Sequence, residues 1–353
     1  MGHALESVAA ALVADGKGIL AADETVPTLT KRFDALGIRS TEQSRRTYRE
    51  MLFTAGAAEF IGGVILQDET IHQKSSDGTP LAQVLSKQGV LPGIKVDTGA
   101  KPLAGFPGET VTEGLDDLRD RLSAYHGMGA RFAKWRAVIH ISDTLPSHGC
   151  ISANAHALAR YAALCQEQDL VPIVEPEVLM DGSHSIERCE EVTGAVQQAV
   201  FHALSEQRVR LERMLLKPNM VIAGKGCPHQ ASVQEVAAAT LRCFVGTCPR
   251  QCPASCFCRV ARRIGRPRYT SRQLIDCLGP SHGRSVFPLA ARSRITHWRR
   301  GVAETRTWLR VGRPCTNAAR FTSAASLGKY TAEMEVTPVS APSPPHRREW
   351  RDD

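Results

Sequence analysis

Short apolar segments alternate with longer amphipathic segments from residue 17 to about residue 220. The apolar segments have the length of strands in a sheet that is buried on both faces. They lie at residues 18–23, 61–66, 93–97, 130–136, 171–177 and 215–219. Amphipathic patterns between them predict helices at residues 42–54, 115–128, 153–168 and 185–206. This strand–helix alternation predicts an α/β fold in which helices cover a parallel sheet.

Charged residues interrupt these apolar segments near their carboxyl ends. A buried parallel strand is expected to be apolar throughout, and barrel enzymes place their active sites at the carboxyl ends of such strands. Because residues two apart on a strand share a face, we expect Lys134 and Arg136 to point together, and likewise Glu175 and Glu177. Structural ion pairing would explain a single pair of charged residues equally well. It does not explain why charged residues occur at the same place on six strands. The charged positions are Asp23, Lys95, Lys134, Arg136, Glu175, Glu177 and Lys217.

Lys217 is the candidate nucleophile, because it lies between Leu215-Leu216 and Pro218. Apolar surroundings favour the neutral form of a lysine amine, which can form an imine, and a nearby cation such as Lys134 adds to this effect. Glu175 is the candidate acid–base group for the carbinolamine, and Asp23 is the candidate acceptor of a hydroxyl proton when a carbon–carbon bond breaks.

Two further cations, Lys95 and Arg136, suit a phosphate group. Arginine offers a two-pronged fork of N–H donors, and lysine offers a point charge. The sequence therefore predicts an anionic substrate held beside a lysine nucleophile.

The positive charge of the chain is concentrated in one segment. The net charge is +8 and the pI is about 9.0, yet residues 245–323 contain sixteen Arg, no Lys and only Asp276 and Glu304 as acids. That segment therefore carries +14, which leaves −6 for the rest of the chain. Seven of the eleven Cys also lie at residue 243 or beyond. Little aromatic interleaving and no binding motif argue against a nucleic-acid or membrane surface. The spacing of Cys248, Cys252, Cys256 and Cys258 matches no standard zinc pattern, so we expect no metal site.

The remaining composition is that of an ordinary globular protein, with 42% hydrophobic and 23% charged residues. No apolar run approaches the length of a membrane span, and we expect no membrane partner. The first residues carry neither a basic region nor a long apolar stretch, so we expect no secretory signal and a cytoplasmic location.

Six motifs occur together in the first two-thirds of the chain. They are Gly16-Lys-Gly-Ile-Leu-Ala-Ala-Asp-Glu24, Ile61-Gly-Gly-Val-Ile-Leu66, Gly93-Ile-Lys-Val-Asp97, Phe132-Ala-Lys-Trp-Arg136, Val171-Pro-Ile-Val-Glu-Pro-Glu177 and Leu215-Leu-Lys-Pro-Asn-Met220. In order and spacing, this set resembles that of class I, Schiff-base-forming fructose-bisphosphate aldolases. The resemblance covers about residues 3–244 and resumes briefly at Leu327-Gly-Lys-Tyr-Thr331.

The resemblance implies a (β/α)8 TIM barrel and reversible cleavage of fructose 1,6-bisphosphate to dihydroxyacetone phosphate and glyceraldehyde 3-phosphate, in glycolysis or gluconeogenesis. It implies a homotetramer, a phosphorylated sugar as the substrate, and neither a cofactor nor a metal. The implied roles are the Schiff base for Lys217, acid–base catalysis for Glu175 with support from Lys134 and Glu177, the cleavage step for Asp23, and substrate binding for Lys95, Arg136, Arg32 and Thr28. Arg32 and Thr28 are expected in the loop after the first strand, where Thr28 replaces the Ser of the family and keeps its hydroxyl.

Two motifs of this family, Leu-Ser-Gly-Gly on the seventh strand and Gly-Arg-Ala-Leu on the eighth, are missing from residues 245–323. The spacing across this segment is kept, and codons shifted by one base permit both motifs at their expected places. We therefore predict that residues 245–323 are a frame-shifted translation, within a single barrel domain at 1–337 and before a disordered tail at 338–353. A chain with corrupted strands 7 and 8 is expected to fold poorly and to be nearly inactive.

Two other interpretations stay open, and a third is disfavoured. The first is a Schiff-base lyase that acts on a different phosphorylated ketose. The second is an inactive aldolase-derived protein that binds a partner through its basic segment. A metal-dependent aldolase is disfavoured, because no His cluster occurs at the predicted strand ends.

Overall fold

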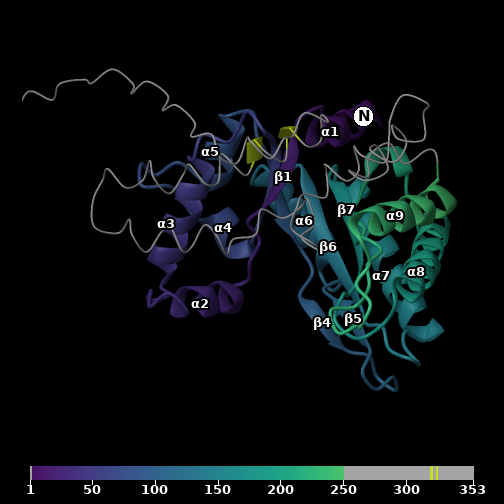
Figure 1. The fold of residues 1–353 in the computed structure, drawn as a ribbon. Helices are drawn as coiled ribbons and strands as arrows, with labels where there is room; N and C mark the ends of the chain where they lie inside the picture. Colours follow the sequence, from purple (N-terminus) through teal and green to yellow (C-terminus); the bar gives the residue numbers. More distant parts are fainter. Residues whose placement is uncertain (1, 250–318, 321–322, 325–353) are drawn as a thin grey trace, which may run out of the picture.

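Six strands form one parallel sheet in the computed structural model, which describes residues 2–249, 319–320 and 323–324 (Figure 1). The order in the sheet, β1-β2-β3-β6-β7-β8, follows the order along the chain, so each crossover joins neighbouring strands. The strands are β1 (Gly18–Ala21), β2 (Ile61–Leu66), β3 (Leu91–Lys95), β6 (Phe132–Ile139), β7 (Val171–Val178) and β8 (Leu215–Leu216). Strands β4 (Gly99–Pro102) and β5 (Thr110–Glu113) form a separate antiparallel pair.

Helices cover the outer face of this sheet. Figure 1 shows α7, α8 and α9 beside β7 and the shorter helices α2 to α5 beyond β1. Trp135 of β6 points outward and packs on Tyr161 of α7, with ring centroids 5.5 Å apart. The helices are α1 (Gly2–Leu12), α2 (Val26–Asp34), α3 (Glu42–Phe53), α4 (Asp68–His72), α5 (Leu81–Ser86), α6 (Leu118–Gly127), α7 (His148–Glu167), α8 (Ile186–Glu206) and α9 (Val233–Thr247), with a 3-10 turn η1 at Leu211–Arg213.

The inner face of the sheet, which carries Phe132 and Lys134, changes from apolar to charged along the strands. Alternate residues share a face, so Phe132 lies below Lys134 on β6, and Ile173 lies below Glu175 on β7. The apolar part forms a cluster with Leu12 and other residues of α1, which covers the amino ends of the strands. The charged side chains therefore gather at the carboxyl ends.

Glycines make room for Phe132 inside this apolar cluster. A Cβ on Gly93 would overlap the Phe132 ring, and a Cβ on Gly63 would lie 2.8 Å from the ring atom Cε1. The buried aromatic ring thus fills space that the neighbouring strands leave free. This accounts for glycine in strands that are otherwise apolar and branched.

Gly93→Ala is expected to lower the free energy of unfolding by about 1–3 kcal/mol, because an added methyl group must displace the packed Phe132 ring. Gly127→Ala is the matched control, since a Cβ there meets no atom within 4 Å at the end of α6. Thermal unfolding of both variants tests this account of the inner face. Equal melting temperatures for the two variants would contradict it.

The predicted elements are confirmed in kind, with differences at their ends. Strand β2 and helix α8 have the expected bounds to within one residue, whereas β6 continues to Ile139 and α7 begins at His148. Strand β8 ends at Leu216, before Lys217, although the Lys217 backbone N–H still donates to the Val174 carbonyl at 2.8 Å.

Some elements of the structure were not predicted, and some predictions concern residues that the structure does not describe. The β4–β5 pair and the short helices α2, α4 and α5 were not among the predicted elements. Residues 250–318 of the segment predicted to be frame-shifted, and the predicted tail at 338–353, lie outside the described residues. Within the described residues, no helix is both long and apolar enough to cross a membrane.

Candidate active site

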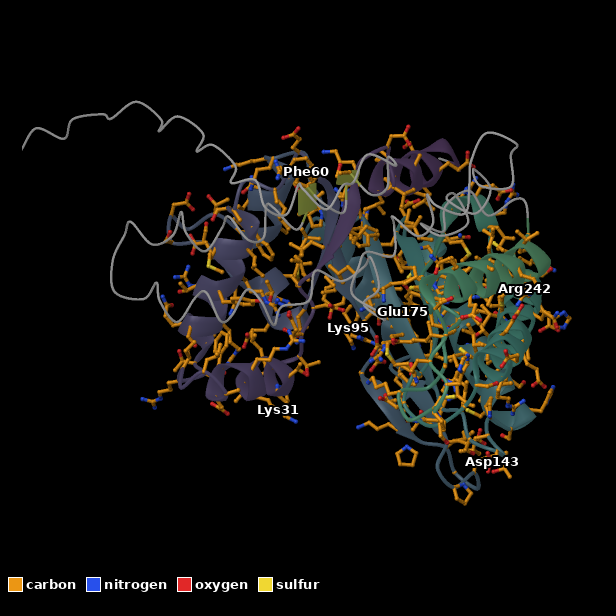
Figure 2. The ribbon with its side chains drawn as sticks, in the orientation of Figure 1. Lys31, Phe60, Lys95, Asp143, Glu175 and Arg242 are labelled. Carbon is orange, nitrogen blue, oxygen red and sulfur yellow. The ribbon has the colours of Figure 1, made fainter. Side chains whose placement is uncertain are left out.

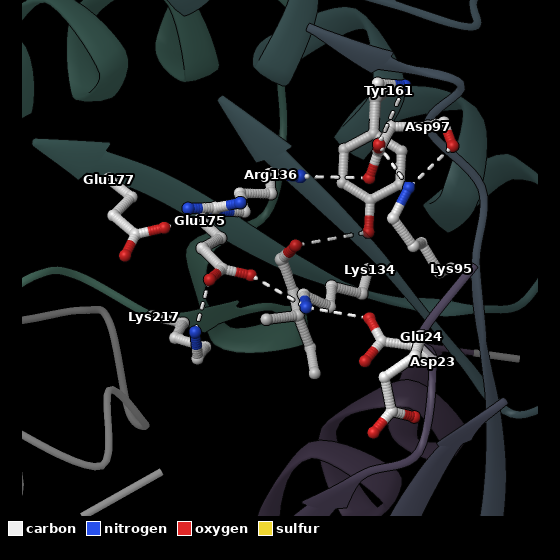
Figure 3. Close-up of polar contacts among 12 residues, drawn as sticks. Asp23, Glu24, Lys95, Asp97, Lys134, Arg136, Tyr161, Glu175, Glu177 and Lys217 are labelled. Carbon is white, nitrogen blue, oxygen red and sulfur yellow. Dashed lines mark hydrogen bonds and ion pairs between the residues drawn. The ribbon is translucent and has the colours of Figure 1, made fainter. Parts of the chain in front are cut away.

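Four charged side chains from four different segments form an unbroken chain of contacts at the carboxyl ends of the strands (Figure 3). Lys134 Nζ donates to Asp23 Oδ2 at 2.8 Å and forms an ion pair with Glu175 Oε2 at 3.2 Å. Glu175 Oε1 accepts a hydrogen bond from Lys217 Nζ. Figure 2 shows Glu175 near the middle of the molecule. The structure thus brings together four of the predicted catalytic residues.

Burial and opposite charge act against each other on these groups. Burial alone lowers the pKa of Lys134, but the carboxylates of Glu175 and Asp23 outweigh it and raise that pKa overall. Burial alone raises the pKa of Asp23 and of Glu175, whereas the Lys134 amine lowers both, with Lys217 adding to the effect on Glu175. Both carboxyl pKa values are lowered overall. The two carboxylates and Lys134 therefore hold one another in their charged forms at neutral pH.

The surroundings of Lys217 differ from those expected. Leu215 and Leu216 are buried, but the Lys217 side chain is 31% exposed and its amine contacts a carboxylate. The predicted apolar surroundings of the amine are wrong, because β8 ends just before Lys217 and leaves the side chain at the rim. Nor is Lys134 a free neighbouring cation, since two carboxylates surround its amine. The accessible lysine can meet a substrate while a proton acceptor already touches it.

The two cations predicted to bind phosphate each have a carboxylate partner. Arg136 Nε donates to Glu177, and Lys95 Nζ donates to the side chain of Asp97 and, at 2.8 Å, to its carbonyl. Asp97 Oδ2 also accepts from the Arg136 backbone N–H at 3.3 Å. The Arg136 side chain is 41% exposed. An incoming anion would have to compete with these carboxylates.

Thr28 and Arg32 lie in helix α2 and not in the predicted loop. The helix begins after Thr25 with Pro27 in its first turn, where proline is well tolerated. Thr28 is exposed and its hydroxyl pairs with that of Thr25 at 3.0 Å. Arg32 Nη1 donates to Glu24 Oε1 at 2.5 Å.

Sequence reasoning missed three residues of this network. Asp97 lies two positions after Lys95, so the rule that alternate strand residues share a face could have identified it. Glu24 directly follows Asp23 in a quoted motif. Arg49, which pairs with Glu24 Oε2 at 2.5 Å, lies in a helix among other arginines, and no local pattern distinguishes it.

Metal ligands do not gather at this site. In the part of the chain that the structure describes, no group of three or more His, Cys, Asp or Glu side chains is placed to hold a metal ion. Of the four cysteines in the predicted non-zinc spacing, Cys248 is described and its thiol contacts the Pro249 carbonyl at 3.8 Å, and the other three lie outside the described residues.

Comparison with known proteins identifies the family. The model of the family described as fructose-bisphosphate aldolase class-I matches residues 4–263, beyond the limit of residue 244 given by the quoted motifs. The chain is 59% identical over 254 residues to a probable fructose-bisphosphate aldolase class 1 of Xanthomonas campestris, a match that covers 72% of this chain and 76% of the relative. It is 51% identical over 247 residues to fructose-bisphosphate aldolase C of Carassius auratus, covering 69% of this chain and 68% of that protein.

A solved structure shares the fold. It is a fructose-bisphosphate aldolase from Plasmodium falciparum in complex with TRAP and a small molecule inhibitor, 38% identical, with a TM-score of 0.82 over 94% of this chain and 96% of the other. Together with the parallel sheet in chain order, this likeness confirms the predicted TIM barrel. The chain belongs to the class I fructose-bisphosphate aldolase family.

Proposed function

We propose that this protein cleaves fructose 1,6-bisphosphate reversibly to dihydroxyacetone phosphate and glyceraldehyde 3-phosphate through a Schiff base on Lys217. The observation that carries the proposal is the continuous set of contacts from Lys217 through Glu175 and Lys134 to Asp23. A retro-aldol cleavage needs a nucleophilic amine, an acid–base group beside it and a second base at the hydroxyl of the breaking bond. Family membership supplies the substrate.

The imine forms in two steps at Lys217. Glu175, which contacts the ammonium group, takes its proton, and the neutral amine attacks the C2 carbonyl of the open-chain sugar. A carbon–nitrogen bond forms as the carbonyl π bond opens onto its oxygen, and a proton passes from the nitrogen to that oxygen to give the carbinolamine. Glu175 then returns a proton to the carbinolamine hydroxyl, which leaves as water. The product is a protonated imine that can accept an electron pair from the neighbouring carbon.

Cleavage follows at the bond between C3 and C4. Asp23 takes the proton of the C4 hydroxyl, the C3–C4 electron pair moves toward the iminium nitrogen, and glyceraldehyde 3-phosphate leaves as the aldehyde. Protonation of the resulting enamine at C3 and attack of water on C2 release dihydroxyacetone phosphate and the free amine. Lys134 keeps Glu175 and Asp23 ionised between these transfers, because its amine contacts both carboxylates.

Phosphate binding is assigned to Lys95, Arg136, Arg32 and Thr28. Lys95 ends β3 and pairs with Lys134 on the adjacent strand β6, where Arg136 lies two positions further along and is partly exposed. Glu177 holds the Arg136 guanidinium through its Nε, which leaves other donors of the fork for an anion.

Borohydride trapping tests the covalent step. The protein is incubated with dihydroxyacetone phosphate, reduced, digested and analysed by mass spectrometry. The adduct is expected on Lys217 and not on Lys225, a nearby exposed lysine that pairs with Asp181 at 2.7 Å. An adduct elsewhere, or none in an actively cleaving preparation, would disprove the Schiff-base assignment.

The proposal extends to residues 245–323, which we assign to a frame-shifted translation. The missing motifs and the Arg-rich, Lys-free composition of this segment support this assignment. Resequencing the coding DNA over codons 240–325 tests it, with one base gained or lost near each end as the expected result. An unchanged reading frame would contradict it and would favour an aldolase-derived binding protein.

The remaining parts of the proposal are a homotetramer, a cytoplasmic location and a role in glycolysis or gluconeogenesis. The homotetramer and the metabolic role rest on the resemblance of the motifs to the class I family, to which the chain belongs. Sedimentation analysis of the purified protein tests the assembly. A monomer at micromolar concentration would contradict the homotetramer.

A further inference from the structure

Glu24 has two arginine partners that differ in their burial. Arg49 Nη1 pairs with Glu24 Oε2 at 2.5 Å, and Arg32 Nη1 pairs with Glu24 Oε1 at 2.5 Å. The Arg49 side chain is 2% exposed, whereas that of Arg32 is 32% exposed. Arg49 is held further by a hydrogen bond from Nη2 to the Glu24 carbonyl at 3.0 Å, and it stacks over the Tyr48 ring. One partner is therefore fixed in the core, and the other lies at the surface.

A buried carboxylate is costly to leave without a cation. The Glu24 side chain is only 10% exposed; burial by itself raises its pKa, but Arg49 and then Arg32 outweigh burial and lower it. With Arg32 as the sole partner, any movement of Arg32 toward a substrate would leave Glu24 charged, buried and unpaired. With Arg49 in place, Glu24 keeps a cation when Arg32 moves.

We infer that Arg49 is a positioning residue that makes Arg32 available to the phosphate of the substrate by keeping Glu24 paired. The inference rests on the proposed function, because it requires Arg32 to bind the phosphorylated sugar. Arg49 itself is too deeply buried to touch the substrate. Its effect passes through Glu24, which directly follows the proposed base Asp23 in the chain.

Steady-state kinetics of Arg49→Met with fructose 1,6-bisphosphate tests this role. We expect KM to rise about tenfold, equivalent to about 1.4 kcal/mol, because Arg32 stays on Glu24. A much smaller change in kcat is expected, since the four contacting catalytic side chains are unaltered. Arg45→Met is the matched control. Arg45 lies one turn earlier on α3 and forms a two-pronged pair with Glu69, at 2.9 and 2.5 Å, that does not involve Glu24.

The double variant Glu24→Gln with Arg49→Met separates positioning from general support of the fold. It removes the charge that retains Arg32, so KM is expected to return to near the wild-type value, which a structural role of Arg49 would not produce. An unchanged KM in Arg49→Met, an equal rise in Arg45→Met, or a KM that stays high in the double variant would overturn the inference. If Arg49→Met does not fold, the KM of the double variant decides alone.

Borohydride trapping on the wild-type protein distinguishes failure of the role of Arg49 from failure of the proposed function. Trapping on Lys217 together with any of the overturning kinetic results rejects only the role of Arg49. Absence of both trapping and cleavage in the wild type rejects the proposed function and, with it, this inference.

Discussion

Lys217→Met is expected to lower kcat by a factor on the order of 10⁶, as loss of a covalent nucleophile does in other enzymes. The variant removes the only atom that can form the imine in the proposed mechanism. The fold is expected to persist, because Lys217 is 31% exposed and Glu175 keeps Lys134 as a cation partner at 3.2 Å. The measurements are the rate of fructose 1,6-bisphosphate cleavage and the far-UV circular dichroism of the variant.

Lys225→Met is the matched control for this experiment. Lys225 is also ion-paired to one carboxylate, Asp181, but is 65% exposed and lies in the loop before α9. We expect its kcat to be close to that of the wild type. If Lys217→Met cleaved the substrate at more than about a hundredth of the wild-type rate, a mechanism that depends on imine formation at this residue would be excluded. The acid–base groups that remain contribute about 10²–10⁴-fold by themselves, which is too little to sustain such a rate.

Lys134→Met is expected to damage both stability and activity. Its amine is buried between Asp23 and Glu175, and removing one partner of a buried ion pair costs about 3–5 kcal/mol because the other charge stays buried. The activity is expected to fall by a factor on the order of 10²–10⁴, since Asp23 loses its hydrogen-bonded cation and Glu175 keeps only Lys217 in contact. Chemical denaturation and cleavage assays measure the two effects.

The stability difference between the wild type and Lys134→Met is expected to depend on pH. The folded-state pKa values of Asp23 and Glu175 lie below their ordinary values of 3.8 and 4.5, so their contribution is present above those values and is lost as the pH falls through the folded pKa values. In Lys134→Met the cation with the largest lowering effect on both pKa values is absent, although Lys217 still lowers that of Glu175. The stability difference between wild type and variant is therefore expected to be largest near neutral pH and to shrink below about pH 4.

Lys17→Met provides the control for the loss of a partly buried lysine. Lys17 Nζ donates to the Ala58 carbonyl at 2.8 Å, and no ion pair joins it to a buried carboxylate among the residues that the structure describes. A loss of about 0.5–1.5 kcal/mol is expected, with little change of that loss between pH 7 and pH 4. If Lys134→Met lost the same amount of stability, independent of pH, then Lys134 would not stabilise the fold through its carboxylate partners.

The alternation of side chains along a strand predicted which charged residues of β6 and β7 face the active site. Lys134 and Arg136, and likewise Glu175 and Glu177, point to the same face, because side chains of a strand alternate whatever the rest of the chain does. The parallel arrangement also followed from the sequence, since repeated strand–helix units leave few other topologies. The catalytic and binding roles of these residues stay predictions until the variants are measured.

The partners of the charged groups could not be predicted in the same way. Lys134 and Asp23 are 111 positions apart, and their contact depends on how β1 and β6 lie around the inner face. Glu24 forms ion pairs with Arg49 of α3 and with Arg32 of α2, a segment that was expected to be a loop. Pairing over such distances depends on the packing of whole elements.

The sequence by itself determined the alternating strands and helices, the charged ends of the strands and the family, because these follow from local periods and from motifs that are short and contiguous. Only the tertiary structure decided that Lys217 lies at an accessible rim against Glu175, and that Lys134 is enclosed by two carboxylates. Burial and charge pairing are set by groups that converge from distant segments. The electrostatic state of each side chain therefore emerges only when the barrel has brought those segments together.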